Sequence, residues 1–245
     1  MGDSLWAEEL TFMEVRDKIR AGTTAIIIGT GGVEQNGPYV AGGKHNYVLQ
    51  TVLPYIARSI GNALIAPIVK FVPEGSIEPP DGHMRYAGTI GLEAATFEAL
   101  LTDICRSYKA HGFTDIILLG DSGGNQDGME RVANALNKRW AAEQPRVHYL
   151  REYYAEDQWS DAFLRSQGIA QIDRNPPAGQ AADRPSDWRN GLIRTAERMQ
   201  AGLFTLHGVD LAPVEKLIDL GGKLAEYRAQ ITASAFAASK KRLRP

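Results

Sequence analysis

Short runs of consecutive apolar residues alternate along this chain with longer segments in which apolar residues recur every three or four positions. The runs predict buried strands over 23–29, 63–69, 115–120 and 146–149. The helical spacing predicts helices over 6–21, 47–60, 92–110 and 129–142, with another near 157–166. Strands that alternate with helices are typical of a parallel sheet covered by helices. We therefore predict an α/β fold, a three-layer sandwich with a central, mainly parallel sheet.

Two loops and the basic chain end interrupt this alternation. The loop over 72–88 is rich in proline and glycine and is too long and polar for a simple crossover, so we expect it to build a surface or a site. The segment over 170–188 has the composition of a mobile loop, and the end SKKRLRP is expected to be solvated.

The composition and net charge of the chain indicate which kinds of binding partner to expect. The chain has 245 residues, of which 44% are hydrophobic and 23% charged, and this fits a single domain over 1–245. A net charge of -2, from 27 basic and 29 acidic residues, favours neither nucleic acid nor membrane. We expect a small-molecule substrate and copies of the chain itself as partners. Cys105 is expected in the core, and the lack of a signal-peptide or membrane-spanning pattern predicts a cytoplasmic protein.

The glycine-rich turn after the first predicted strand brings together side chains that can do chemistry. Glu34 follows Gly31, Gly32 and Val33, and His45 lies eleven residues later, just before the next predicted helix. Ligands of open α/β sheets gather at such strand ends. A carboxylate and an imidazole could bind zinc or manganese or act as an acid/base pair, whereas a capping role for Glu34 is the structural alternative.

A second strand, DIILLG, ends in a similar polar and glycine-rich turn. Asp121 and Ser122 follow it directly, so Asp121 is the natural third ligand beside Glu34 and His45. Ser122 lacks the G-x-S-x-G order of a nucleophile elbow, but it belongs to the candidate catalytic set of Glu34, His45, Asp121 and Ser122. Candidate substrate-binding residues are Asn36, Glu78, His83, Gly123, Gly124 and Asn125. We expect structural roles for His111, His148 and His207.

Four motifs in order, EQNGP, GKHN, GHMRYAGTI and GDSGGN, resemble those of the creatininase (creatinine amidohydrolase) family. The family pattern reads E-Q-H-G-P, G-T-D, E-H-x-x-F-P-G-T and N-G-H-G-G-N, and the resemblance covers roughly residues 20 to 130. It implies a creatininase-like α/β fold, a two-metal site, hydrolysis of cyclic amides or other non-peptide C–N bonds, and a homo-oligomer, commonly a hexamer.

The resemblance also marks where this chain departs from its family. Glu34 matches the glutamate ligand, but Asn36 stands where a histidine ligand is expected, His45 where the bridging aspartate is expected, and Ser122 where another histidine is expected. The family's proton-shuttling histidine past the middle of the chain has no counterpart between His148 and His207. Our working hypothesis is therefore one divalent ion held by Glu34, His45 and Asp121, with water in the fourth position.

Three functions follow from these residues. The first is a metal-dependent amidohydrolase, in which the ion polarises a carbonyl, Glu34 or His45 orients the water, and the amides of Gly123 and Gly124 hold the oxyanion. The second keeps the pocket without a metal and uses His45 and Asp121 as an acid/base pair. The third is a catalytically silent relative that binds a ligand in the same crevice.

Overall fold

The computed structural model of the chain describes residues 4–36, 41–141, 143–155, 162–163, 166–167, 205–206, 209–210 and 214–243. The predicted loop over 170–188, most of the predicted helix near 157–166, and His207 lie outside these residues. Cys105 is fully buried, as the sequence predicts.

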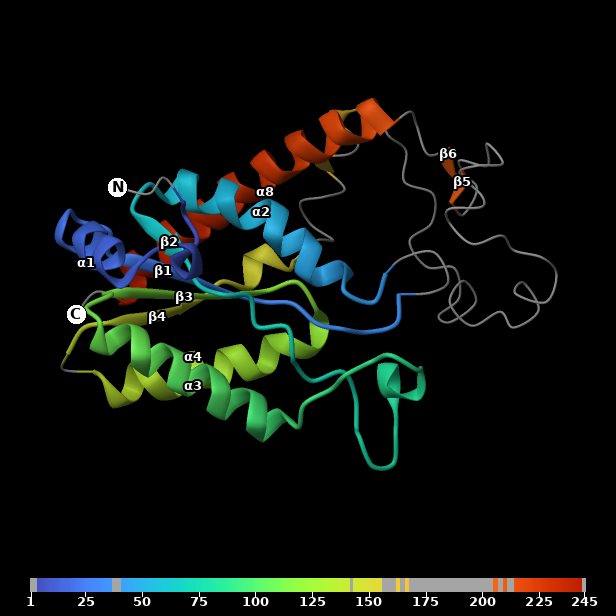
Figure 1. The fold of residues 1–245 in the computed structure, drawn as a ribbon, viewed down its shortest axis with the longest axis horizontal. Coiled ribbons are helices and arrows are strands. Elements are labelled where there is room, and N and C mark those ends of the chain that lie inside the picture. The colour runs from blue at the N-terminus through green and yellow to red at the C-terminus, as the bar shows by residue number, and fades with distance from the viewer. Residues whose placement is uncertain are drawn as a thin grey trace.

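Four of the described strands form a parallel sheet in the order β2-β1-β3-β4 (Figure 1). Its members are β1 (Ala25–Thr30), β2 (Ala63–Ile65), β3 (Asp115–Gly120) and β4 (Arg146–Tyr149). Every residue of β1 and β3 is buried, which explains why both strands read as continuous apolar runs. The predicted α/β class with a mainly parallel sheet is confirmed. The strand expected over 63–69 stops at Ile65, and Val69 pairs with Thr30 only through an isolated bridge.

Helices cover both faces of this sheet. They are α1 (Phe12–Arg20), α2 (Lys44–Ile60), α3 (Ala94–Ala110), α4 (Gln126–Arg139) and α8 (Val214–Leu243). Short 3₁₀ turns are η1 (Ala7–Glu9), η2 (Gly82–Arg85), η3 (Gly123–Asn125) and η4 (Arg151–Tyr153), and β5 (Thr205–Leu206) pairs antiparallel with β6 (Val209–Asp210). Helix α2 begins at Lys44, earlier than the apolar spacing predicts, so His45 lies in its first turn.

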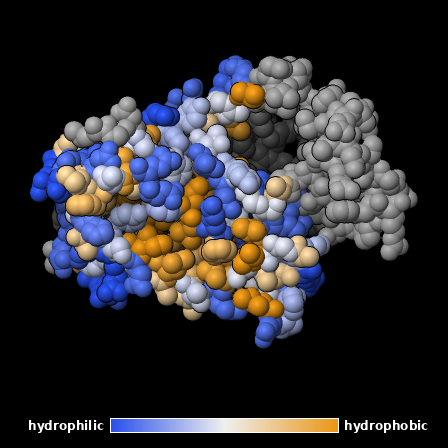
Figure 2. Space-filling model, in the orientation of Figure 1, coloured by the Kyte–Doolittle hydropathy of each residue, from blue (hydrophilic) through white to orange (hydrophobic). Residues whose placement is uncertain are grey.

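The alternation of side chains along the strands divides the apolar core in two. Ile26 and Ile28 face α3 and α4, whereas Ile27 faces α2 and α8. In Figure 1, α2 and α8 accordingly lie on one side of the sheet and α3 and α4 on the other. Some apolar surface is left uncovered in the described chain, including Phe71 at 51% and Ile90 at 48% exposure. Figure 2 shows apolar side chains gathered near the centre of one face.

The basic chain end is not solvated throughout, which corrects the sequence-based expectation. Ser239 is buried and shares a hydrogen bond of 2.9 Å with His148 Nδ1, while His148 Nε2 lies 3.1 Å from Asp115 Oδ1. Lys240 Nζ donates to Asp115 Oδ2 at 3.0 Å. Burial alone would raise the pKa of Asp115, but its bonds to His148 and Lys240 outweigh burial and lower it. These contacts fasten the end of α8 to the sheet.

A close approach at Gly124 fixes the loop over 72–88 against the end of β3. A Cβ at position 124 would lie 2.6 Å from the backbone carbonyl oxygen of Pro73, closer than packed atoms allow. We expect Gly124→Ala to displace this loop and to lower the free energy of unfolding by about 2 kcal/mol, the usual cost of overpacking. Chemical denaturation measures the change. Gly221→Ala is the control, because its Cβ would meet nothing within 4 Å and alanine favours a helix.

Candidate functional site

Two neighbouring strands and one helix assemble the candidate site. β1 and β3 pair in parallel, so the residues that follow them leave the same edge of the sheet, and Asp121 N extends the pairing by donating to Thr30 O at 3.0 Å. Glu34 leaves β1 at this edge. The first turn of α2 then returns over the strand ends and carries His45 with it. Glu34, His45 and Asp121 are each no more than 6% exposed.

His45 lies between the two carboxylates. Its Nε2 is 2.6 Å from Glu34 Oε1, and its Nδ1 is 2.9 Å from Asp121 Oδ2. The two nitrogens point in divergent directions from the ring, so the carboxylates occupy opposite edges of the imidazole. The three predicted side chains therefore meet, but as a chain in the order Glu34, His45, Asp121.

The pKa values in this cluster favour an imidazolium between carboxylates. Burial alone would lower the pKa of His45, but its hydrogen bonds to Asp121 and Glu34 outweigh burial and raise it. Burial alone would raise the pKa of Glu34, but hydrogen bonds from His45 and Glu74 outweigh it and lower the pKa to about 2. At neutral pH, Glu34 is therefore a carboxylate, and the raised pKa means that His45 holds its proton more tightly than an exposed imidazole does.

Asp121 has a second set of partners, which the sequence did not reveal. Tyr153 Oη donates to Asp121 Oδ1 at 2.9 Å, and Arg228 Nη2 lies 3.0 Å from the same oxygen. Arg228 belongs to α8, more than one hundred positions along the chain, so no motif around Asp121 could indicate this contact.

Glu74 is a further buried carboxyl that the sequence placed only in a polar loop. It is 5% exposed and hydrogen-bonded to Glu34, and its Oε1 has no hydrogen-bond partner in the described part of the chain. Burial, followed by the bond and the negative charge of Glu34, raises the pKa of Glu74 to about 9. At neutral pH, Glu74 is therefore protonated and donates to Glu34. Its place in the polar loop, between Pro73 and Gly75, was the sequence signal.

His83 lies at the more open side of the cluster, where its side chain is 41% exposed. Its Nε2 is 3.6 Å from Glu34 Oε2, a spacing that suits a bridging water rather than a direct hydrogen bond. Gln35 Nε2 lies 3.2 Å from His83 Nδ1. Because the amide nitrogen of Gln35 donates, His83 Nδ1 is the acceptor, and Nε2 is the ring nitrogen directed towards Glu34.

The remaining predicted residues after β3 surround the cluster more loosely. Ser122 is buried beside Asp121, but the ring nitrogens of His45 face carboxylates rather than its hydroxyl. Gly123 and Gly124 are exposed, and a Cβ at Gly123 would lie 2.9 Å from Tyr154 Oη. Asn125 is fully buried and donates to the carbonyls of Thr30 and Gly31, so it ties the two strand ends together.

Two predicted substrate-binding residues are placed differently. The amide of Asn36 donates to the carbonyl oxygens of Glu34, Ala41 and Gly42, so it stabilises its own loop. Glu78 is exposed on the loop over 72–88. Within the described residues, neither side chain has a hydrogen bond to the side chains of Glu34, His45 or Asp121.

The donor types in the cluster suit zinc or manganese, but their arrangement does not. No group of three or more histidine, cysteine, aspartate and glutamate side chains in the described residues is placed to hold an ion. Because Glu34 and Asp121 bond to opposite edges of His45, one ion cannot contact all three while both hydrogen bonds remain. The expected site, in which Glu34, His45 and Asp121 share one metal, stays a prediction that requires one of these hydrogen bonds to open.

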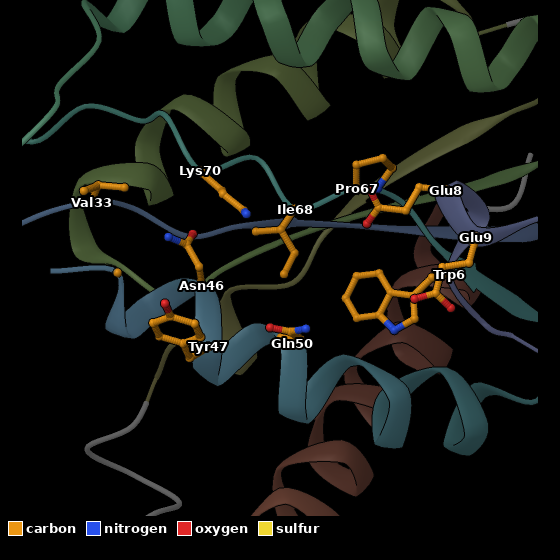
Figure 3. Close-up of a pocket in the computed structure, with 11 residues that line it drawn as sticks. Trp6, Glu8, Glu9, Val33, Asn46, Tyr47, Gln50, Pro67, Ile68 and Lys70 are labelled. Carbon is orange, nitrogen blue, oxygen red and sulfur yellow. The ribbon is translucent and has the colours of Figure 1, made fainter. Parts of the chain in front are cut away.

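A groove of about 370 Å³ lies beside the cluster (Figure 3). Val33 and Asn46, the chain neighbours of Glu34 and His45, line one end, and Trp6 lies at the other. The Asn46 side chain accepts from the backbone N–H of Gly32 and donates to its carbonyl, in the turn that leads to Glu34. None of the predicted site residues lines this groove.

Comparisons with known proteins agree with this architecture. The profile of the creatininase family, described as creatinine amidohydrolase, matches residues 8–179. A creatinine amidohydrolase from Pseudomonas putida is 27% identical over 119 residues, which are 49% of this chain and 45% of the relative. The match thus spans about half of the length of that relative. Among the described residues, no helix is both long and apolar enough to cross a membrane.

Solved structures share the fold at lower identity. A mutant creatininase of Zn-Zn type superposes on this chain with a TM-score of 0.64 at 18% identity. The superposition covers 100% of each of the two chains. A structure named creatininase Mn has a TM-score of 0.64 at 19% identity and covers 99% of this chain and 100% of its own. The family profile matches well over half of the sequence, and this chain therefore belongs to the creatininase family.

Proposed function

We propose that this chain is a hydrolase that cleaves a C–N bond in a small, cyclic amide. The observation that carries the proposal is the position of His45 between Glu34 and Asp121 at the carboxyl end of the parallel sheet. Membership in the creatininase family and the relative named creatinine amidohydrolase support amide hydrolysis as the reaction class.

In this reaction the oxygen of water bonds to the carbonyl carbon, the C–N bond breaks, and the nitrogen leaves with a proton. Glu34 holds the water through Oε2, the oxygen that faces His83 across 3.6 Å. His45 donates the proton that the leaving nitrogen needs, and the proton that the water loses passes to Glu34 and returns to His45 across their hydrogen bond of 2.6 Å. Asp121 holds His45 in place through Nδ1 and stabilises its charge.

The exposed glycine amides after β3 complete this proposal. Gly123 and Gly124 are exposed beside the buried Asp121 and Ser122, and backbone N–H groups there can hold the developing oxyanion. This role stays a prediction, as do those of Ser122, Asn125, Asn36 and Glu78.

Turnover of a panel of small cyclic amides tests the proposal. We expect hydrolysis of at least one member, creatinine and simple lactams included, and a rate that falls sharply in Glu34→Gln. Linear amides of the same size serve as the comparison, and ring opening is followed by mass spectrometry. Absence of hydrolysis across the panel, with and without added zinc or manganese, would favour the silent ligand-binding alternative.

Metal content is a separate question, because relatives of this fold are zinc and manganese forms. Elemental analysis of the wild type beside His45→Ala, after dialysis against trace divalent ions, addresses it. A stoichiometric ion lost in the variant would support metal-dependent hydrolysis and would require His45 to release one of its carboxylates. No ion in either protein would support the acid/base enzyme without metal.

A homo-oligomer also stays a proposal, and uncovered apolar surface supports it. Phe71 and Ile90 lie beside the isolated bridge between Val72 and Gly91, and both are about half exposed. Light scattering on the purified protein measures the assembly. The cytoplasmic location and the absence of nucleic-acid and membrane partners remain predictions.

A further inference from the structure

An arginine lies within the buried stripe of the C-terminal helix. Residues of α8 that face the protein interior recur every three or four positions and are otherwise apolar or small: Ala225, Ala229, Thr232, Phe236 and Ser239. Arg228 occupies the same stripe and is only 6% exposed. Burial of a guanidinium costs free energy unless the group is paired and hydrogen-bonded, so the partners of Arg228 must offset this cost.

Arg228 is held on several sides. Its Nη2 lies 3.0 Å from Asp121 Oδ1, and its Nε and Nη2 donate to Tyr153 O at 3.3 and 3.1 Å. The guanidinium carbon also lies 3.8 Å from the centre of the Tyr153 ring. Tyr153 in turn donates its hydroxyl to the same Asp121 oxygen. Arg228 and Tyr153 thus form one rigid support for a single carboxylate oxygen.

The other oxygen of that carboxylate bonds to His45. Because Oδ1 is occupied by Arg228 and Tyr153, Oδ2 is the oxygen that points at His45 Nδ1, 2.9 Å away. With Nδ1 directed to Asp121 Oδ2, the other ring nitrogen, Nε2, is directed to Glu34. The orientation of His45 therefore depends on a residue of a helix that lies outside the matched family region, 8–179.

We propose that Arg228 is a positioning residue of this site, which acts with Tyr153 through Asp121 to orient His45 towards Glu34. The catalytic consequence rests on the function proposed above, whereas the effect on the His45 ring does not. Hydrogen-bond partners that orient metal-binding histidines change activity by about 10- to 100-fold when they are removed, and we expect an effect of the same size here.

An arginine of β4 that holds the end of the same helix provides the control. Arg146 Nε donates to the carbonyl of Leu243, at the end of α8, and its other nitrogens donate to Trp140 and Ala141. It thus fastens α8 without contact to the candidate site. Arg146→Met removes a comparable guanidinium and leaves the Asp121 carboxylate untouched.

The experiment compares Arg228→Met, Arg228→Lys and Arg146→Met by ¹⁵N NMR of the histidine rings and by steady-state kinetics. The chain has 5 histidines, so His45→Gln identifies the His45 signals. We expect Arg228→Met to alter the His45 nitrogen shifts and to lower kcat by about 10- to 100-fold with little change in KM. Arg228→Lys should recover part of both, and Arg146→Met should alter neither.

The outcomes separate this inference from the proposed function. Unchanged His45 shifts in folded Arg228→Met would overturn the positioning role, and so would equal changes in Arg146→Met. Altered His45 shifts would support it even if the wild type hydrolysed no amide, a result that would count against the proposed function alone. If Arg228→Met does not fold, Tyr153→Phe removes only the second donor to Asp121 Oδ1, and a smaller change in the same signals is expected.

Discussion

Replacement of His45 by glutamine is expected to lower kcat/KM on a hydrolysed cyclic amide by about 10³-fold, within the range that general acid–base groups contribute. Glutamine retains hydrogen bonding but supplies no proton to a leaving nitrogen. It also leaves the buried Glu34 carboxylate without its imidazolium partner, so we expect a loss of about 3 kcal/mol in the free energy of unfolding at neutral pH. Initial rates and chemical denaturation measure the two effects.

His111→Gln is the matched control for this substitution. His111 is exposed at the end of α3, away from the cluster, so neither activity nor stability should change appreciably. Activity of His45→Gln within a factor of about ten of the wild type would contradict a proton-donor role, because acid–base groups contribute far more than that. Circular dichroism establishes that the variant is folded before its rate is interpreted.

The stability of the wild type is expected to fall between pH 5 and pH 8, and Glu74→Gln should remove most of that fall. The pKa of Glu74 is raised from 4.5 to about 9 in the folded chain, so above its unfolded value the unfolded state loses this proton while the folded state keeps it. The free energy of unfolding then falls by about 1.4 kcal/mol for each pH unit, or by about 4 kcal/mol between pH 5 and pH 8. Glutamine donates to Glu34 as the protonated carboxyl does, but it has no proton to lose.

The comparison with Glu74→Gln distinguishes the effect of Glu74 on stability from the effects of Glu34 and His45. Glu34, with its pKa lowered to about 2, contributes stability that is lost only below pH 4.5, outside the window. The raised pKa of His45 also makes stability fall as pH rises, but this term remains in Glu74→Gln and cancels in the comparison. Glu78→Gln, an exposed change on the same loop, is the control. A pH profile of Glu74→Gln that parallels the wild type would refute a protonated Glu74.

The pattern of apolar residues was sufficient to predict the parallel sheet and the edge of the sheet at which the candidate site lies. The apolar runs that became β1 and β3 are buried on both faces, so they carry a strong signal, and their glycine-rich ends mark one edge of a parallel sheet. The length of β2 was overestimated, because apolar residues continue up to Val69 after the pairing with β1 ends at Ile65. Helix α8 was missed because Arg228 and several small residues interrupt its apolar stripe.

The sequence by itself determined which groups are available at the strand ends: Glu34, His45 and Asp121, in a chain that departs from its family at several ligand positions. Only the tertiary structure decided how they meet. The imidazole lies between the carboxylates, Glu74 enters from a loop, and Arg228 enters from α8. Local spacing predicts which side chains share an edge, but the direction of a ring nitrogen and the protonation of a buried carboxyl depend on contacts between residues far apart in sequence.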